Sequence, residues 1–417
     1  MKFGKTDLMT RKPTGETYDA SVGLEPVRPG EAANFAYALV KLTYRVEAGR
    51  LVLAEPSPLA LDLYADPPLE PRFPAGSDYW LFKGGTDVVI EGSARTPDGV
   101  AVTRLEVDAR IGPLRKRIAV FGRREVRWGA NGRVAIQSPE PFTEMPLCYA
   151  NAYGGLDPRV PIAEDMREAF LELAELGIAV DHPGLYPRNA IGKGYCVYPE
   201  PVAGLELPNL EDPDDLLNAQ RLITGDPRRW YLQPLPWCFD WTQRLMYPRE
   251  LLLGLDAWYP CLEPERLLEV QRGYLSREAV EPAELRRVDP CEMYQEASLG
   301  LVARGPLVGR SVNISGMHAE RPELSFRVPP PPEIEIEVDG HFCSPAPRLS
   351  NLVIQPNQEQ VALVWCVHTP ELRRKFVPQV HEEIPLSVRV NGDAKIHYTS
   401  PPSVRSRLRA SSASASP

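Results

Sequence analysis

The fold of this chain is decided by the stretch from Thr86 to Val126, which reads TDVVIEGSA (86–94), RTPDG (95–99), VAVTRLEVDARI (100–111), GP (112–113), LRKRIAVF (114–121) and GRREV (122–126). Polar and apolar residues alternate from Arg104 to Ile111, so successive side chains point to opposite faces of a strand. Pro and Gly at 97–99 and 112–113 predict turns, because Pro fixes φ and Gly tolerates positive φ. We therefore expect three strands joined by short turns into an antiparallel meander.

Further strands are predicted on both sides of this stretch. Residues 40–46 alternate, and the turn at 47–50 leads into a short apolar run at 51–53, which is typical of a β-hairpin. In the last third of the chain, residues 333–338 alternate strictly, and apolar strand-like runs follow at 352–354, 361–367 and 384–390. The sequence thus predicts a mainly β (β-rich α+β) protein with antiparallel sheets.

The middle of the chain lacks this alternation and predicts a helical and Pro-rich loop insertion. Apolar residues with helical spacing occur at 161–177, 214–223, 263–275 and 290–299. We accordingly divide the chain into a flexible N-terminal arm (1–30), an N-terminal antiparallel β region (31–160), the insertion (161–300), a C-terminal β region (301–400) and a disordered tail (401–417).

Composition excludes several classes of function. The formal net charge is -9, whereas general nucleic-acid binders usually carry a basic balance, so we expect no nucleic-acid partner. The 45 prolines are about twice the usual share of ~5% and favour short strands with fixed loops. The seven cysteines are dispersed without a C-x-x-C pair, and neither a signal peptide nor an 18-residue apolar run is evident. These features favour a cytoplasmic protein without a membrane span.

Candidate catalytic or metal-ligating groups are sparse. Cys366 and His368 lie two apart on a predicted strand, but two ligands do not make a zinc site. The acidic row at Glu333, Glu335 and Glu337 lacks the unequal environments that acid–base pairs need. The acidic run 211–215 is interpreted as the cap of a helix, and the basic residues of 115–117 and 123–124 as the solvated face of the meander. We therefore expect no catalytic residues, no cofactor and no bound metal.

A dense group of aromatic residues is the least ordinary feature of the chain. Large aromatic side chains dominate both the centres of protein interfaces and the cores of domains, so two interpretations stay open. One is plain core packing, and the other is contact with a partner, for which Pro234 and Pro236 would stiffen the segment. The predicted partner-binding residues are Trp230, Tyr231, Trp237, Phe239 and Trp241.

Several motifs, in the same order along the chain, resemble a known family. They are GGTDVVIEGSA (84–94), FGRR (121–124), PFTEMPLCYANAYGG (141–155), NAIGKGY (189–195), LPNLE (207–211) and the strand at 361–365. The chain resembles an uncharacterised-domain family encoded beside the spike proteins and toxic effectors of bacterial type VI secretion systems, over about residues 33–385. It departs from the pattern at Arg123, where the family has an acidic residue, and in a longer, more aromatic segment at 230–248.

The resemblance implies a non-enzymatic adaptor or chaperone. Such a protein would bind a secreted effector in the cytoplasm and load it onto the spike protein, and it would carry no catalytic residues. The alternative from another class is a hydrolase acting on carbohydrate or peptide, because β-sandwiches host such sites, which is an argument from fold alone.

Overall fold

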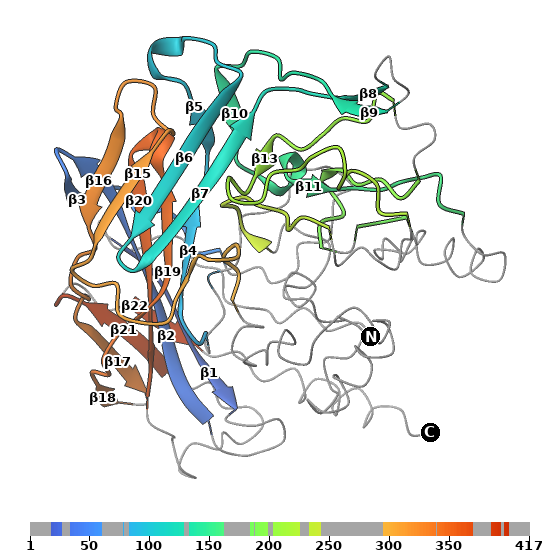
Figure 1. Ribbon diagram of the computed structural model, residues 1–417. Coiled ribbons are helices and arrows are strands. Elements are labelled where there is room, and N and C mark those ends of the chain that lie inside the picture. The colour runs from blue at the N-terminus through green and yellow to red at the C-terminus, as the bar shows by residue number, and fades with distance from the viewer. Residues whose placement is uncertain are drawn as a thin grey trace, which may run out of the picture.

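Strands dominate the part of the chain that can be described (Figure 1). The structure is a computed structural model, and it describes residues 18–26, 34–60, 78, 83–128, 133–161, 184–186, 188–198, 203–225, 233–242, 295–338, 340–369, 385–392 and 396–399. The helical elements described there in full are single 3-10 turns, at η1 (Pro97–Gly99), η2 (Tyr149–Asn151) and η6 (Pro356–Gln358). The prediction of a mainly β protein with mostly antiparallel sheets is confirmed.

The largest sheet has seven strands drawn from both ends of the chain. Its order is β1-β2-β20-β19-β4-β14, and β3 also pairs with β2. All neighbours are antiparallel except β4 and β19, which run parallel. The bounds are β1 (Tyr18–Pro26), β2 (Asn34–Glu47), β3 (Arg50–Leu53), β4 (Thr86–Ile90), β14 (Val302–Ala303), β19 (Arg348–Gln355) and β20 (Gln360–His368).

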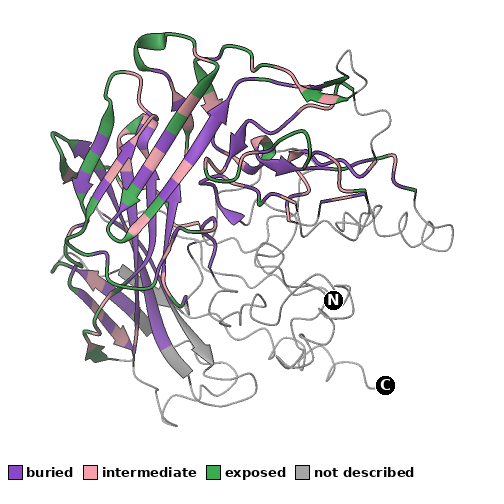
Figure 2. Ribbon diagram, viewed as in Figure 1, coloured by how far each residue is buried: buried purple, intermediate pink, exposed green. Residues whose placement is uncertain are grey.

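A five-stranded antiparallel sheet lies across from it (Figure 1), in the order β13-β7-β6-β15-β16. Its strands are β6 (Arg104–Ile111), β7 (Leu114–Phe121), β13 (Leu210–Glu211), β15 (Ser311–Ser315) and β16 (Glu323–Arg327). Figure 2 shows buried and exposed positions alternating along β6, as its sequence predicts. One core cluster joins the two sheets, with Val107 and Ile111 from β6 and Leu352 and Ile354 from β19.

Smaller sheets complete the fold. The four-stranded sheet has the order β18-β17-β21-β22 and contacts β1 and β2. Three two-stranded pairs, β5–β10, β8–β9 and β11–β12, are formed besides. The bounds are β5 (Ser93–Arg95), β8 (Val126–Trp128), β9 (Val134–Ile136), β10 (Glu144–Pro146), β11 (Tyr153–Gly154), β12 (Lys193–Gly194), β17 (Ile334–Val338), β18 (His341–Cys343), β21 (Pro385–Val390) and β22 (Ile396–Thr399).

Two predicted hairpins are confirmed, and the predicted meander is only half right. β2 pairs with β3, and β6 pairs with β7 through the turn at 112–113. The strand at 86–90, however, belongs to the other sheet, where it lies between β19 and β14. The physical reason is that alternation sets which face of a strand is buried and says nothing about which strand it pairs with.

The predicted N-terminal arm is partly wrong, because residues 18–26 form β1 and pair with β2 in register Tyr18↔Leu42. Asp19 and Ser21, two polar residues of this segment, are buried. The Asp19 carboxylate accepts hydrogen bonds from the amides of Ala20 (3.0 Å) and Leu59 (2.8 Å), which compensates its removal from water. The predicted boundary between two β regions also does not separate sheets, since strands from both regions share the two largest ones.

The helix predicted at 214–223 is wrong, because this segment consists of turns. The Asp212 carboxylate accepts from the amide of Asp214 at 3.0 Å, and the Asn218 side chain accepts from the amide of Gln220 at 3.0 Å. Such local bonds favour turns over helix. Residues 295–299 of the candidate at 290–299 are not helical either. Three other predictions lie outside the described residues: the helix at 161–177 except for residue 161, the helix at 263–275, and the tail 401–417. Among the described residues, no helix is long and apolar enough to cross a membrane.

Candidate functional site

The predicted aromatic anchors that the structure describes differ in burial. Phe239 and Trp241 are fully buried in the main core, and the Trp241 indole donates to Glu91 Oε1 at 2.7 Å. Trp237 is only partly buried and packs against the same core from outside. Trp230 and Tyr231 lie outside the described residues. Of the three predicted residues that the structure describes, Trp237 is therefore the one that lies where a partner has access.

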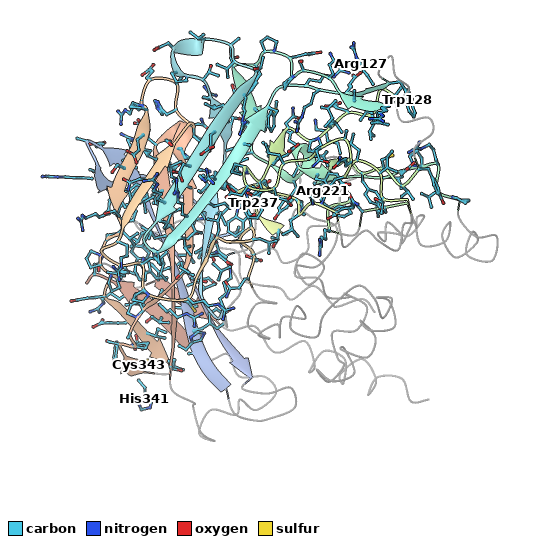
Figure 3. The ribbon with its side chains drawn as sticks, in the orientation of Figure 1. Arg127, Trp128, Arg221, Trp237, His341 and Cys343 are labelled. Atoms are coloured by element: carbon cyan, nitrogen blue, oxygen red, sulfur yellow. The ribbon has the colours of Figure 1, made fainter. Side chains whose placement is uncertain are left out.

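The segment that carries Trp237 is held in place along its length. The Tyr186 hydroxyl donates to the carbonyl of Pro234 at 2.7 Å, and the Ser298 hydroxyl donates to the carbonyl of Cys238 at 2.6 Å. The indole of Trp237, which is labelled in Figure 3, donates to the carbonyl of Arg117 in β7 at 2.7 Å. These bonds fix the ring beside β7, so little conformational entropy remains to be lost when a partner binds.

Trp237 lies in a surface hollow of about 360 Å³, which we call the Trp237 hollow. Its rim is charged, with Arg117 holding Asp214 through two oxygens at 2.7 and 2.8 Å. Arg115 binds Asp108 of the neighbouring strand at 3.1 and 3.0 Å, and its own side chain stays 54% exposed. The lining residues are Arg115, Lys116, Arg117, Asp212, Pro213, Asp214 and Trp237. An aromatic side chain inside a polar rim is the common arrangement of a protein-binding site.

Lys116 corrects the interpretation of the basic run 115–117 as a solvated face. Arg115 is exposed, but Lys116 is buried, and its ammonium donates to Ser298 Oγ and to the carbonyl of Leu299, both at 2.7 Å. The same ammonium lies 4.2 Å from the centre of the Trp237 ring, a cation–π contact. Lys116 thus lines the hollow and contacts the Trp237 ring.

Arg124 and Glu211 also differ from their predicted roles. Arg124 is buried over the Phe121 ring at 4.0 Å, and its guanidinium pairs with Glu211. Glu211 was expected to cap a helix, but its carboxylate is buried and accepts from the amide of Leu217 at 2.7 Å. Burial raises the pKa of Glu211, and Arg124 opposes that rise. The pair ties β13 to the chain that follows β7.

A second buried ion cluster holds the start of β4. The Lys83 ammonium, fully buried, donates to Asp87 Oδ2 at 2.7 Å, to Glu296 Oε2 at 3.1 Å and to Asn351 Oδ1 at 2.7 Å. The Asn351 amide in turn donates to Asp78 at 3.0 Å, and Asp78 binds Lys41 at 3.0 Å. Burial lowers the pKa of Lys83, but Asp87 and Glu296 outweigh it and hold that pKa above its ordinary value. These charges compensate one another and join separate segments.

The remaining chemical candidates show no assembled site within the described residues. Cys366 Sγ lies 3.6 Å from His368 Nε2, so the two share a face as predicted. Burial raises the pKa of Cys366 to about 12 and lowers that of His368, which makes the sulfur a poor nucleophile at neutral pH. Of the glutamate row, Glu335 pairs with Arg389 and Glu337 accepts from Ser387.

Metal ligation and an enclosed substrate site find no support there either. In the described ranges no three His, Cys, Asp or Glu side chains are grouped as metal ligands. A cavity beside Tyr153 and Leu217 has only about 30 Å³, which is room for about a water molecule.

The important buried charges were missed from the sequence because their partners are distant. Lys83 and Glu296 are 213 residues apart, and Arg124 and Glu211 are 87 apart. For one pair the sequence did contain a local indication of the contact, because Lys83 and Asp87 have i,i+4 spacing around the Gly-Gly turn. Lys116 shares a strand face with the apolar residues at 118 and 120, which was a further indication that this face of β7 is covered.

Comparison with other proteins places the chain in a family. No curated protein and no solved structure matches it. Residues 31–366 match the profile of DUF2169, described as "Uncharacterized protein conserved in bacteria", and this match covers most of the 417 residues. The chain therefore belongs to the bacterial DUF2169 family.

Proposed function

We propose that this protein is a non-enzymatic adaptor or chaperone that binds a secreted effector of a type VI secretion system and loads it onto the spike protein. The type VI assignment rests on the motif resemblance described above. The observation that carries the binding role is the Trp237 hollow, where a fixed aromatic ring lies within a rim of charged side chains.

The motifs behind the resemblance also have structural roles here, which supports a binding protein over an enzyme. Asp87 of the first motif holds Lys83, and Tyr149 and Tyr153 of the long motif are buried. In the LPNLE motif (207–211) the Asn209 side-chain amide donates to the carbonyl of Phe121 at 2.9 Å. Within the described residues, no observation favours the alternative of a carbohydrate or peptide hydrolase.

Capture of partners from native bacterial cells tests the proposal directly. The tagged full-length protein is expected to retain a spike protein and an effector through washing, both identified by mass spectrometry. Recovery of neither protein, from cells in which both are detected, would contradict the proposal.

Trp237→Ala is expected to weaken capture of the effector or spike about thirtyfold, or about 2 kcal/mol, because a central aromatic anchor carries much of the energy of such interfaces. The matched control is Trp128→Ala, which removes a tryptophan that is 43% exposed on β8, outside the hollow (Figure 3). Affinity and melting temperature are measured on the same preparations. Equal affinities for the two variants, both folded, would exclude Trp237 as an anchor.

A further inference from the structure

The edge of β7 opposite β6 is only partly paired. β13 covers it at Val120 and Ala119, and next to them the amide of Phe121 donates to the carbonyl of Asn209 at 2.8 Å. Backbone groups of every second residue on a strand face the same side. The N–H and C=O groups of Arg115 and Arg117 therefore face the same edge as those of Phe121.

The pairing stops at this point for a chemical reason. Continuing the register of Leu210↔Val120 and Glu211↔Ala119 would set Pro213 opposite Arg117. Proline has no N–H to donate, so it cannot extend the ladder. The Trp237 indole N–H supplies the missing donor to the Arg117 carbonyl at 2.7 Å.

Beyond that bond the edge of β7 remains open toward the Trp237 hollow. No described residue pairs with the backbone N–H of Arg117 or with the N–H and C=O of Arg115, and both residues line the hollow. An edge with free donors and acceptors in alternation is a template for another strand.

We propose that an extended segment of a partner protein adds to this edge as a β-strand at Arg115–Arg117. The proposal rests on the adaptor function proposed above and specifies how the partner is held. The partner residue opposite Arg115 would exchange two backbone hydrogen bonds with it, which is how strand addition provides affinity.

Side chains at the edge define the chemistry of the added segment. The Arg115 guanidinium is 54% exposed and shares the single carboxylate of Asp108 with Arg110, which leaves a net positive charge, so an acidic residue suits the position opposite Arg115. Residues before and after that position would face the side of Lys116 and Trp237. The Lys116 charge is already bound by Ser298, Leu299 and the indole ring, so apolar side chains suit those two positions.

The first test uses the full-length protein and a synthetic peptide, acetyl-Ser-Thr-Val-Glu-Val-Thr-Ser-amide. Its matched control carries the same side chains with an N-methyl group on the Glu nitrogen, which removes the N–H that would bond to the Arg115 carbonyl. Residue-resolved hydrogen exchange is expected to slow about tenfold or more at the amides of Arg115 and Arg117 with the first peptide and to remain unchanged with the second.

The second test compares Arg115→Pro with Arg115→Ala. Proline removes the free N–H and fills the edge, and edge strands accept it where the N–H makes no ladder bond. Arg115→Pro is expected to weaken peptide binding about tenfold or more, whereas Arg115→Ala keeps the backbone and should weaken it by about fivefold at most. Melting temperatures confirm folding, and if Arg115→Pro does not fold, the exchange data on the wild-type protein decide.

Three results would overturn strand addition. One is equal effects of the two peptides on exchange. Another is slow exchange of the Arg115 and Arg117 amides in the protein without peptide. If this protection does not depend on protein concentration, other residues of the same chain cover the edge. If it rises with concentration, a second copy of the protein covers it. The last is capture of the effector or spike by Arg115→Pro as strong as by the wild type, in which case the adaptor function stands and the docking mode fails.

Discussion

Replacing Lys83 with Met is expected to lower the free energy of unfolding by about 3–5 kcal/mol, because it leaves two buried carboxylates without their cation. Lys83 is fully buried and bonds to Asp87 at 2.7 Å and Glu296 at 3.1 Å. Methionine has a similar length and no charge, so the substitution tests the ion cluster with little change in packing. Urea unfolding measures the effect, with an unchanged m value showing that the same surface is exposed.

The matched control is Lys193→Met, which removes an ion pair of the same short length at the surface. Lys193 binds Glu206 at 2.7 Å, but the two side chains are 24% and 42% exposed. Water screens such a pair, so its loss should cost less than about 1 kcal/mol. Equal costs for the two variants would show that burial of the Lys83 cluster contributes nothing.

The dependence on pH follows from the direction of the Lys83 pKa. Its carboxylate partners hold that pKa above the ordinary value of 10.5, so the contribution to stability is fully present below 10.5 and is lost as the pH rises through the higher folded value. The difference between wild type and Lys83→Met is therefore expected to stay constant from about pH 7 to about pH 9. A difference that vanished inside this range would place the titration on another group.

Strands that pair with their neighbours in sequence were the predictable part of the fold. β6 alternates and is joined to β7 by a two-residue turn, so the register of the pair and the buried face of β6 follow from local sequence. β4 behaves differently, because its partner β19 comes from the last third of the chain and runs parallel to it. An apolar run such as 86–90 is equally compatible with many partners, so its place in the sheet depends on the whole chain.

Polar residues inside the fold account for most of the errors. Asp19 and Ser21 made residues 18–26 look like a loose arm, yet both are buried within β1. Arg124 and Glu211 sit in runs of like charge that are normally solvated, and each is buried because the other compensates it. A run of charged residues predicts exposure because burying a charge costs free energy. The sequence pattern does not show a compensating partner that is distant along the chain.

The candidate site was predicted in part for the same reason. Aromatic density pointed to the segment around Trp237, whose role in binding stays a prediction, but the placement of Phe239 and Trp241 in the core depends on contacts with β4 and with Glu91. The hollow itself lies beyond the end of β13 at Glu211, beside Pro213, and its open backbone groups belong to β7. The hollow thus combines residues of β7, of 212–214 and of the segment around Trp237, and no local sequence pattern indicates that these three segments meet.

The second large effect is expected for Gly155→Ala, at about 3 kcal/mol or more of lost stability. Gly155 has φ +97, and a Cβ there would lie 2.5 Å from the carbonyl oxygen of Gly192, a backbone atom. The strand ends cannot move apart easily, because the amide of Gly155 donates to Asn189 at 2.9 Å and its carbonyl accepts from Tyr186 at 2.9 Å. Backbone strain and overpacking each cost roughly 1–3 kcal/mol.

Gly225→Ala separates these two contributions. Gly225 has φ +76, and no atom lies within 4 Å of the position that an alanine methyl group would take, so only the backbone strain of about 1–2 kcal/mol applies. Chemical unfolding of both variants is compared with partner capture by the same proteins. Because Gly155 closes the long motif of the family resemblance, the outcome also says what that motif is for. If Gly155→Ala is less stable than Gly225→Ala and still captures its partner when folded, this glycine is needed for the fold. If Gly155→Ala has wild-type stability but no longer captures its partner, the expectation is wrong and the motif belongs to the interface.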